Sequence, residues 1–222
     1  MKKLPALLSI LLMLGFAAGP SRAGSDQDQN LAGKLSEVYE NTPHGYAHGM
    51  TRADLAKAYR EDPGDAAVSP SAFRPHQTFI YRACGLIKVE VDFRPSTAKQ
   101  AGPADLITNI SLPYVDFAAP TNADANLDAE LTQELRAVQA DFEKLKPGVT
   151  RAELVKLFER FVGPILAVPD MYRFKQHEEF NYRRCGCIYI DVDFRHWFSK
   201  NDQPTDIITK VSKPHIFAGP IG

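Results

Sequence analysis

The sequence contains little of what usually reveals a function. Its 222 residues include only three cysteines, too few for a disulfide scaffold, and at least one thiol is left unpaired within the chain. The 26 lysines and arginines are balanced by 27 aspartates and glutamates, so no excess of positive charge is available to neutralise nucleic-acid phosphates. The sequence also has no P-loop, no Gly-x-Ser-x-Gly elbow and no His-Glu-x-x-His pair. We therefore expect no nucleic-acid partner, and the commonest enzyme classes lose support.

One stretch of the sequence is apolar enough to suggest a targeting or membrane segment. Two lysines precede an almost uncharged run over residues 4–19, and small residues follow at positions 21 and 23. This order is typical of a cleaved secretory signal. The alternative is a retained anchor, but the run is shorter than the ~18 apolar residues of a spanning helix and is interrupted by glycine. We predict a signal peptide over residues 1–23, a periplasmic or secreted mature protein, and no membrane span.

The strongest pattern is an internal repeat with a period of about 100 residues. Its matching blocks keep their order and a nearly constant offset: 31–38 with 131–138, 49–55 with 148–154, 81–85 with 182–186, 91–94 with 192–195, 103–108 with 204–209, and 117–120 with 217–220. We predict one unit over residues 24–117 and a second over 127–222. A linker rich in Pro, Ala, Asn and Asp joins them at 118–126.

Each unit is predicted to begin with two helices. The first has leucine and valine at the spacing of a single buried helix face. The second starts with a capping box, in which Thr51 is followed by Asp54 and Thr150 by Glu153. We expect this second helix to continue through Tyr59 in the first unit and through Phe158 in the second.

The apolar period then changes to two. Apolar side chains alternate with charged ones over residues 87–94, and with Tyr189 and charged ones over 188–195, which predicts strands with one buried and one wet face. A three-residue hairpin loop before each strand pairs Phe79 with Val89 and keeps apolar partners on one face, whereas a two-residue turn does not. This loop requires a left-handed residue, at Gly85 in the first copy and Gly186 in the second.

A third strand is predicted at 106–112 and again at 207–213, each ended by proline. The expected fold class is α+β: two tandem α-α-β-β-β repeats, with the helices on the apolar face of each antiparallel sheet. The opposite face has no helix left to cover it.

Two tandem units of this kind resemble the β-lactamase inhibitory protein (BLIP) fold. The residues that carry the resemblance are Gly-Met-Thr at 49–51 and Gly-Val-Thr at 148–150, each before a helix and followed by a sheet. The same helix start resembles BamE-type lipoproteins of outer-membrane assembly, and the Tyr-Arg-x-Cys hairpin resembles uncharacterised exported bacterial proteins. In the inhibitor the concave sheet face grips an enzyme, so the resemblance implies that the helix-free face binds a protein.

The charged strand face of the second unit is the candidate binding surface. Tyr, Trp and Arg commonly anchor protein interfaces, and the segment 189–197 contains all three. The first unit has Pro-Ser-Thr at the place of residues 196–198, which favours the second unit as the functional one. An alternative is that Trp197 closes the edge of the core. The candidate binding residues are Glu90, Asp92, Arg183, Tyr189, Asp191, Asp193, Arg195, His196 and Trp197.

Asp191 and Asp193 permit a different hypothesis, a cation site or acid–base pair in a small metal-dependent or hydrolytic enzyme. Bases are expected beside these carboxylates across the sheet, from Arg82, Lys88 and Arg183, and no ligand loop accompanies them. Two other patterns are weak. The Cys-x-Cys at 185–187 lacks zinc-ribbon spacing, and the histidines at 44 and 48 lie among proline and glycine. We therefore expect no metal and no cofactor, and we favour an extracytoplasmic protein-binding or inhibitory module over an enzyme.

Overall fold

The computed structural model describes residues 26–43, 49–66, 73–96, 102–119, 128–161, 176–195 and 201–217. The predicted signal peptide, residues 120–126 of the predicted linker, and the histidines at 44 and 48 lie outside these ranges. The first half consists of α1 (Asp26–Asn41), α2 (Arg52–Leu55), β1 (Tyr59–Glu61), α3 (Pro63–Ala66), β2 (His76–Tyr81), β3 (Ile87–Arg94), β4 (Leu106–Ile110) and β5 (Tyr114–Val115). The second half consists of α4 (Ala129–Phe142), α5 (Arg151–Leu157), β6 (Phe158–Arg160), β7 (His177–Tyr182), β8 (Ile188–Arg195), β9 (Ile207–Val211) and β10 (His215–Ile216). The predicted α+β class is confirmed.

The ten strands form one antiparallel sheet. Their order is β1-β2-β3-β5-β10-β8-β7-β6, while β4 pairs with β3 and β9 with β8. The halves meet where Tyr114 of β5 pairs with His215 of β10. These two short strands follow Pro113 and Pro214, where the chain leaves β4 and β9, and the sequence pattern does not predict them. The joint makes the two halves parts of one continuous sheet.

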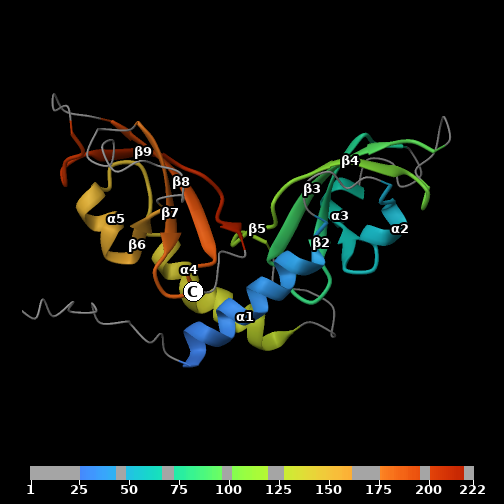
Figure 1. Ribbon diagram of the computed structural model, residues 1–222, viewed down its shortest axis with the longest axis horizontal. Helices are drawn as coiled ribbons and strands as arrows, with labels where there is room; N and C mark the ends of the chain where they lie inside the picture. Colours follow the sequence, from blue (N-terminus) through green and yellow to red (C-terminus); the bar gives the residue numbers. More distant parts are fainter. Residues whose placement is uncertain are drawn as a thin grey trace, which may run out of the picture.

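Helices α1 and α4 lie together across the base of the sheet, whose two arms rise on either side of β5 and β10 (Figure 1). Each helix begins at the hairpin of the opposite half. Asp28 of α1 forms an ion pair with Arg184 at 2.8 Å, and the Asp128 amide, just before α4, donates to the Ala83 carbonyl at 2.6 Å. Lys34 adds ion pairs at 2.8 Å to Asp128 and Glu130. The buried residues of the two halves also form one continuous hydrophobic cluster.

The predicted strand pattern is confirmed. Apolar side chains of β3 and β8 are at most 4 % exposed, and the alternating charged side chains are partly or fully exposed. Phe79 pairs with Val89 and Phe180 with Ile190, as the three-residue loop requires. Gly186 has a φ of +67°, but Gly85 does not have the predicted positive φ. The first loop instead turns twice, through hydrogen bonds from the Cys84 amide to Tyr81 and from the Ile87 amide to Cys84.

Both capping boxes are present, at Thr51 and Thr150. The predicted length of the second helix is wrong, because α2 ends at Leu55 and α5 at Leu157. Tyr59 and the residues after it form edge strand β1, and the corresponding β6 begins at Phe158. The backbone hydrogen bonds of β1 to β2 and of β6 to β7 replace those that a longer helix would form. Among the described residues, no helix has the length and apolar character needed to cross a bilayer.

Candidate functional site

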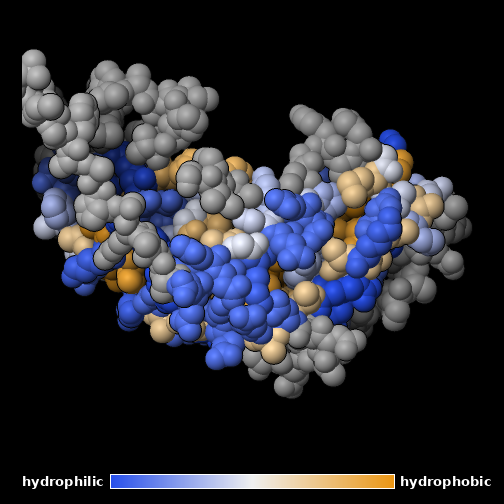
Figure 2. All heavy atoms as spheres, turned by 60° about the horizontal axis from the view of Figure 1, so that its bottom comes forward, coloured by the Kyte–Doolittle hydropathy of each residue, from blue (hydrophilic) through white to orange (hydrophobic). Residues whose placement is uncertain are grey.

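The sheet face opposite α1 and α4, which we call the open face, carries most of the predicted site. Its side chains come from the four central strands: Lys88, Glu90 and Asp92 from β3, Tyr114 from β5, His215 from β10, and Tyr189, Asp191 and Asp193 from β8. The side chains of Glu90 and Asp191 are 40 % and 35 % exposed, so no described segment seals this face. The surface seen from the side of α1 and α4 is largely hydrophilic (Figure 2).

One row of the open face runs across the joint between the halves. Lys88 pairs with Tyr114, Tyr114 with His215, and His215 with Tyr189. Lys213 of the second half reaches back to the first. Its ammonium lies 4.1 Å from the Tyr114 ring centroid and 3.1 Å from a Glu90 carboxylate oxygen. The open face is therefore one surface built by both halves.

A pocket of about 340 Å³ opens on this face in the second half. Phe161 and Phe217 each meet the Tyr189 ring edge-on, with ring centroids 5.2 and 5.6 Å from it. Leu112, which is 42 % exposed, contributes a wall from the first half. Ile190, Glu179, Asp191 and His215 complete the lining. The pocket is thus aromatic inside and acidic at its polar edge.

Burial sets the charge state of the histidine in this pocket. It lowers the pKa of His215, and Asp191, 3.9 Å from Nε2, opposes the shift only in part. Burial also raises the pKa of Tyr189. Near neutral pH the imidazole of His215 and the phenol of Tyr189 are therefore both uncharged.

The first half fills the same three positions with an ion-paired triad. Lys88 corresponds to Tyr189, and its ammonium lies 2.8 Å from Asp62 and 2.9 Å from Asp116. Asp62 follows β1 as Phe161 follows β6, and the two amides donate to the equivalent carbonyls of Thr78 and Glu179. We call the first set the charged triad and the second, Phe161, Tyr189 and Phe217, the aromatic triad.

This correspondence corrects the predicted tail repeat by one residue. Asp116 and Phe217 donate their amides to Leu86 and Cys187, which occupy the same place in the two hairpins. Phe217 therefore matches Asp116, although its sequence context resembles that of Phe117. Sequence comparison missed the aromatic triad for this reason.

The Asp191–Asp193 pair is bound by a histidine rather than by the predicted bases. His177 Nδ1 lies 2.7 Å from Asp193, and Nε2 lies 3.7 Å from Asp191. These contacts raise the pKa of His177, the hydrogen bond to Asp193 most of all. His76 and Asp92 repeat the bond in the first half, also at 2.7 Å.

The prediction that Arg82, Lys88 and Arg183 balance these carboxylates is wrong. Arg82 donates to the Ala56 carbonyl, and Lys88 belongs to the charged triad. Arg183 donates to the Val155 carbonyl and pairs with Glu159, at the outer edge of the sheet. Arg82 and Arg183 lie at the hairpin end of the sheet and bond to backbone carbonyls there. Arg183 therefore lies away from the Asp191–Asp193 pair, and its place in the candidate binding set stays a prediction.

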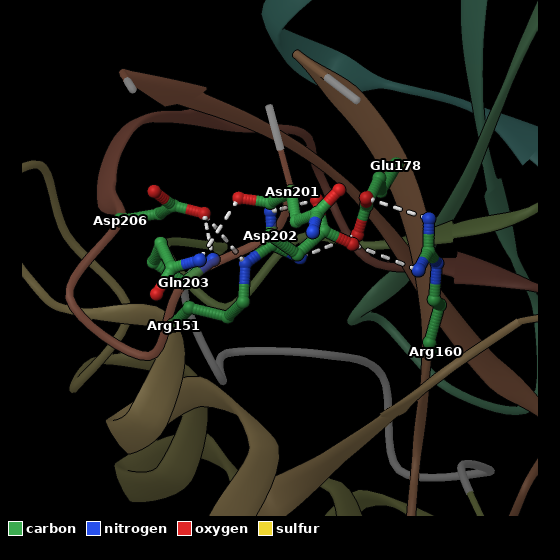
Figure 3. A network of polar contacts seen from close by, with 7 residues as sticks. All are labelled: Arg151, Arg160, Glu178, Asn201, Asp202, Gln203 and Asp206. Carbon is green, nitrogen blue, oxygen red and sulfur yellow. Dashed lines mark hydrogen bonds and ion pairs between the residues drawn. The ribbon is translucent and has the colours of Figure 1, made fainter. Parts of the chain in front are cut away.

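A buried ionic network lies on the other side of the sheet, and the sequence reading missed it (Figure 3). Arg151 packs 3.8 Å from the Phe194 ring centroid and pairs with Glu178 at 2.6 Å and Asp206 at 3.2 Å. Arg160 joins it through Glu178 and Asp202. The arginine of the repeated Thr-Arg-Ala block marks this buried position in both halves, since Arg52 is likewise buried over the Phe93 ring. This network ties α5 to β7 and to the chain before β9.

Two predicted residues, His196 and Trp197, lie outside the described ranges, and Arg195 is exposed at the end of β8. Within the ranges that are described, no group of three or more His, Cys, Asp or Glu side chains is arranged to hold a metal ion. Comparison with known proteins adds no identification: no family model, no curated protein and no solved structure matches the chain.

Proposed function

We propose that the protein is an extracytoplasmic binding or inhibitory module that holds a protein partner on its open face. The observation that carries this proposal is the aromatic pocket, which lies on the helix-free face and is lined by both halves. Anchor side chains of protein interfaces are typically received by such pockets near the centre of a contact surface. The two-repeat BLIP-like arrangement belongs to the same proposal, supported by the repeated sequence blocks and by the parallel order of elements in the halves.

The lining indicates the chemistry of the partner. The aromatic triad and Leu112 favour an aliphatic or aromatic side chain inserted between them. Glu179 and Asp191 at the polar edge favour a lysine or arginine beside it. The partner is therefore a protein surface on which an apolar side chain stands next to a basic one.

An enzyme centred on Asp191 and Asp193 is the alternative proposal, and it has less support. The Asp193 carboxylate accepts a hydrogen bond from His177, and Asp191 lies between His177 and His215. Such an arrangement is typical of charge balance on a strand face. Stoichiometric zinc or calcium in the purified protein, measured by elemental analysis, favours the enzyme instead.

Site-specific photo-crosslinking tests the binding proposal. Leu112 and Val155 are similarly exposed, at 42 % and 40 %, but Val155 lies on α5, away from the pocket. A benzophenone amino acid at position 112, in the full chain expressed in its own source cells, is expected to give a discrete crosslinked protein. The same group at position 155 is the matched control and is expected to give none. Equal products from both positions, or none from 112, contradict the proposal.

A further inference from the structure

The hairpin between β7 and β8 carries two thiols, Cys185 and Cys187, whereas the equivalent hairpin of the first half carries one. Cys185 is partly exposed, and Cys187 is 5 % exposed. The first half has the fully buried Cys84 at the place of Cys185, and Leu86 at the place of Cys187. The fold therefore accepts leucine at this core position, and packing alone does not account for a second thiol there.

The loop geometry brings these two thiols together. Gly186 separates them with a φ of +67°, and its amide donates to the Tyr182 carbonyl at 2.8 Å. Two Cα atoms with one residue between them are at most about 7 Å apart, and a bent backbone brings them within the ~4.4–6.8 Å span of a disulfide. A Cβ on Gly186 meets no atom within 4 Å, so glycine serves the backbone angle there, not a lack of space.

The thiols are also chemically unequal. The interaction between the two side chains lowers the pKa of Cys185 and raises that of Cys187. The partly exposed thiol is thus the one that ionises more readily. A partly exposed thiol that ionises readily, beside a buried second thiol, is the arrangement of an attacking and a resolving cysteine.

We propose that Cys185 and Cys187 form a dithiol–disulfide redox pair that exchanges electrons with small thiols or with the disulfides of other proteins. The Cys185 thiolate attacks one sulfur of a disulfide RS–SR, forms a mixed disulfide and releases RS⁻. The Cys187 thiolate then attacks the Cys185 sulfur, closes the intrachain disulfide and releases the second RS⁻. Two electrons pass to RS–SR, and the two thiol protons leave on two RSH. This inference does not depend on the proposed partner binding.

The other thiol of the chain is the natural control. Cys84 is fully buried, accepts a hydrogen bond from the Thr132 hydroxyl at 3.5 Å, and has its pKa raised by burial. A Cys84→Ser chain is expected to retain the redox pair unchanged. Cys187→Leu introduces the residue that the first half already uses at this place, and it is expected to fold.

Equilibration with glutathione tests the proposal on the full chain. The reduced protein is incubated in buffers of defined reduced and oxidised glutathione, quenched with acid, alkylated with N-ethylmaleimide and weighed intact by mass spectrometry. We expect two thiols to be lost together in one two-electron transition, in the wild type and in Cys84→Ser. Cys187→Leu is expected to accumulate a mixed disulfide with glutathione at Cys185. Persistence of that mixed disulfide in the wild type, a disulfide that includes Cys84, or three alkylated thiols in every buffer overturns the proposal.

Discussion

The two halves share a backbone but fill one corner of the open face in opposite ways. The charged triad of the first half closes on itself, with Lys88 held between Asp62 and Asp116. The aromatic triad of the second half has rings edge to edge and leaves a pocket beside them. A self-satisfied ion triad offers a partner little, because its charges are already paired, whereas exposed aromatic edges gain free energy when another apolar group covers them. If the open face binds a protein as proposed, we expect the second half to contribute the recognition surface and the first half to act as scaffold.

The buried arginines give the largest expected difference between the halves. Replacing Arg151 with methionine leaves the buried Glu178 with Arg160 alone and the buried Asp206 with the Gln203 amide. Because these two carboxylate side chains are only 2 % and 1 % exposed, the loss is expected to lower the free energy of unfolding by about 3–5 kcal/mol. Arg52→Met is expected to cost less, because its partners are the neutral Gln77, the exposed Glu61 and Asp105, which keeps backbone donors. Urea denaturation of both variants measures the difference. A larger loss in Arg52→Met contradicts it.

Exchanging the triads tests the division of roles directly. Phe161→Asp/Tyr189→Lys/Phe217→Asp copies the charged triad into the second half, where the equivalent backbone bonds exist. We expect the fold to persist and the crosslink from position 112 to fall by about 10-fold or more, since an anchor worth ~2 kcal/mol corresponds to roughly 30-fold in affinity. The reverse exchange, Asp62→Phe/Lys88→Tyr/Asp116→Phe, leaves the pocket untouched and serves as the control. If both exchanges reduce the crosslink equally, the roles are not divided.

The hairpin glycines provide a smaller contrast. Gly186 adopts a φ of +67°, and Gly85 does not have a positive φ. Because an L-residue in the left-handed region costs roughly 1–2 kcal/mol, Gly186→Ala is expected to destabilise the protein by about that amount, and Gly85→Ala by less. Chemical denaturation of the two variants decides this prediction. Equal costs indicate that the second loop changes its turn when alanine is introduced.

Local rules predicted the capping boxes and the alternating strands because each depends on residues within a few positions of one another. They also predicted the hairpin register, since a shift by one residue at Phe79 places aromatic side chains on the polar face. The helix was extended wrongly through Tyr59 because its last turn competes with an edge strand whose partner, β2, lies about 20 residues further along the chain. Short-range periodicity contains no information about that partner.

The site was predicted in part. Tyr189, Asp191 and Asp193 were assigned to the open face by alternation, and Glu90 and Asp92 likewise. The pocket was not, because Phe161 and Phe217 reach Tyr189 only through β6 and β10, strands of three and two residues. The sequence pattern did not predict the joint between the halves either, because β5 and β10 have only two residues each. Elements this short are stabilised by tertiary pairing and leave little trace in a periodic pattern.

The two histidines of the second half give the smallest expected effect on stability, and their pKa shifts have opposite signs. The pKa of His177 is raised by Asp193, Asp191 and Glu179, so its contribution to stability is complete below an unfolded pKa of about 6.5 and is lost as the pH rises through the folded pKa. The pKa of His215 is lowered by burial, with Lys213 adding to the shift and Asp191 and Glu90 opposing it. Its contribution is present above about pH 6.5 and is lost as the pH falls through the folded pKa.

Urea denaturation between about pH 5 and pH 9, a range that brackets the ordinary pKa of histidine, separates the two effects. His177→Gln is expected to destabilise the protein in the acidic part of the range and to match the wild type in the alkaline part, by less than about 1 kcal/mol because the pair is exposed. His215→Gln is expected to remove part of the acid sensitivity of the wild type. Loss of stability in His177→Gln that grows with pH contradicts the raised pKa and the Asp193 contact that causes it. His177 lies on the acidic edge of the open face, and His215 lies inside the pocket. The two pKa shifts have opposite signs, so the stability contributed at the acidic edge falls with rising pH and that contributed in the pocket falls with decreasing pH.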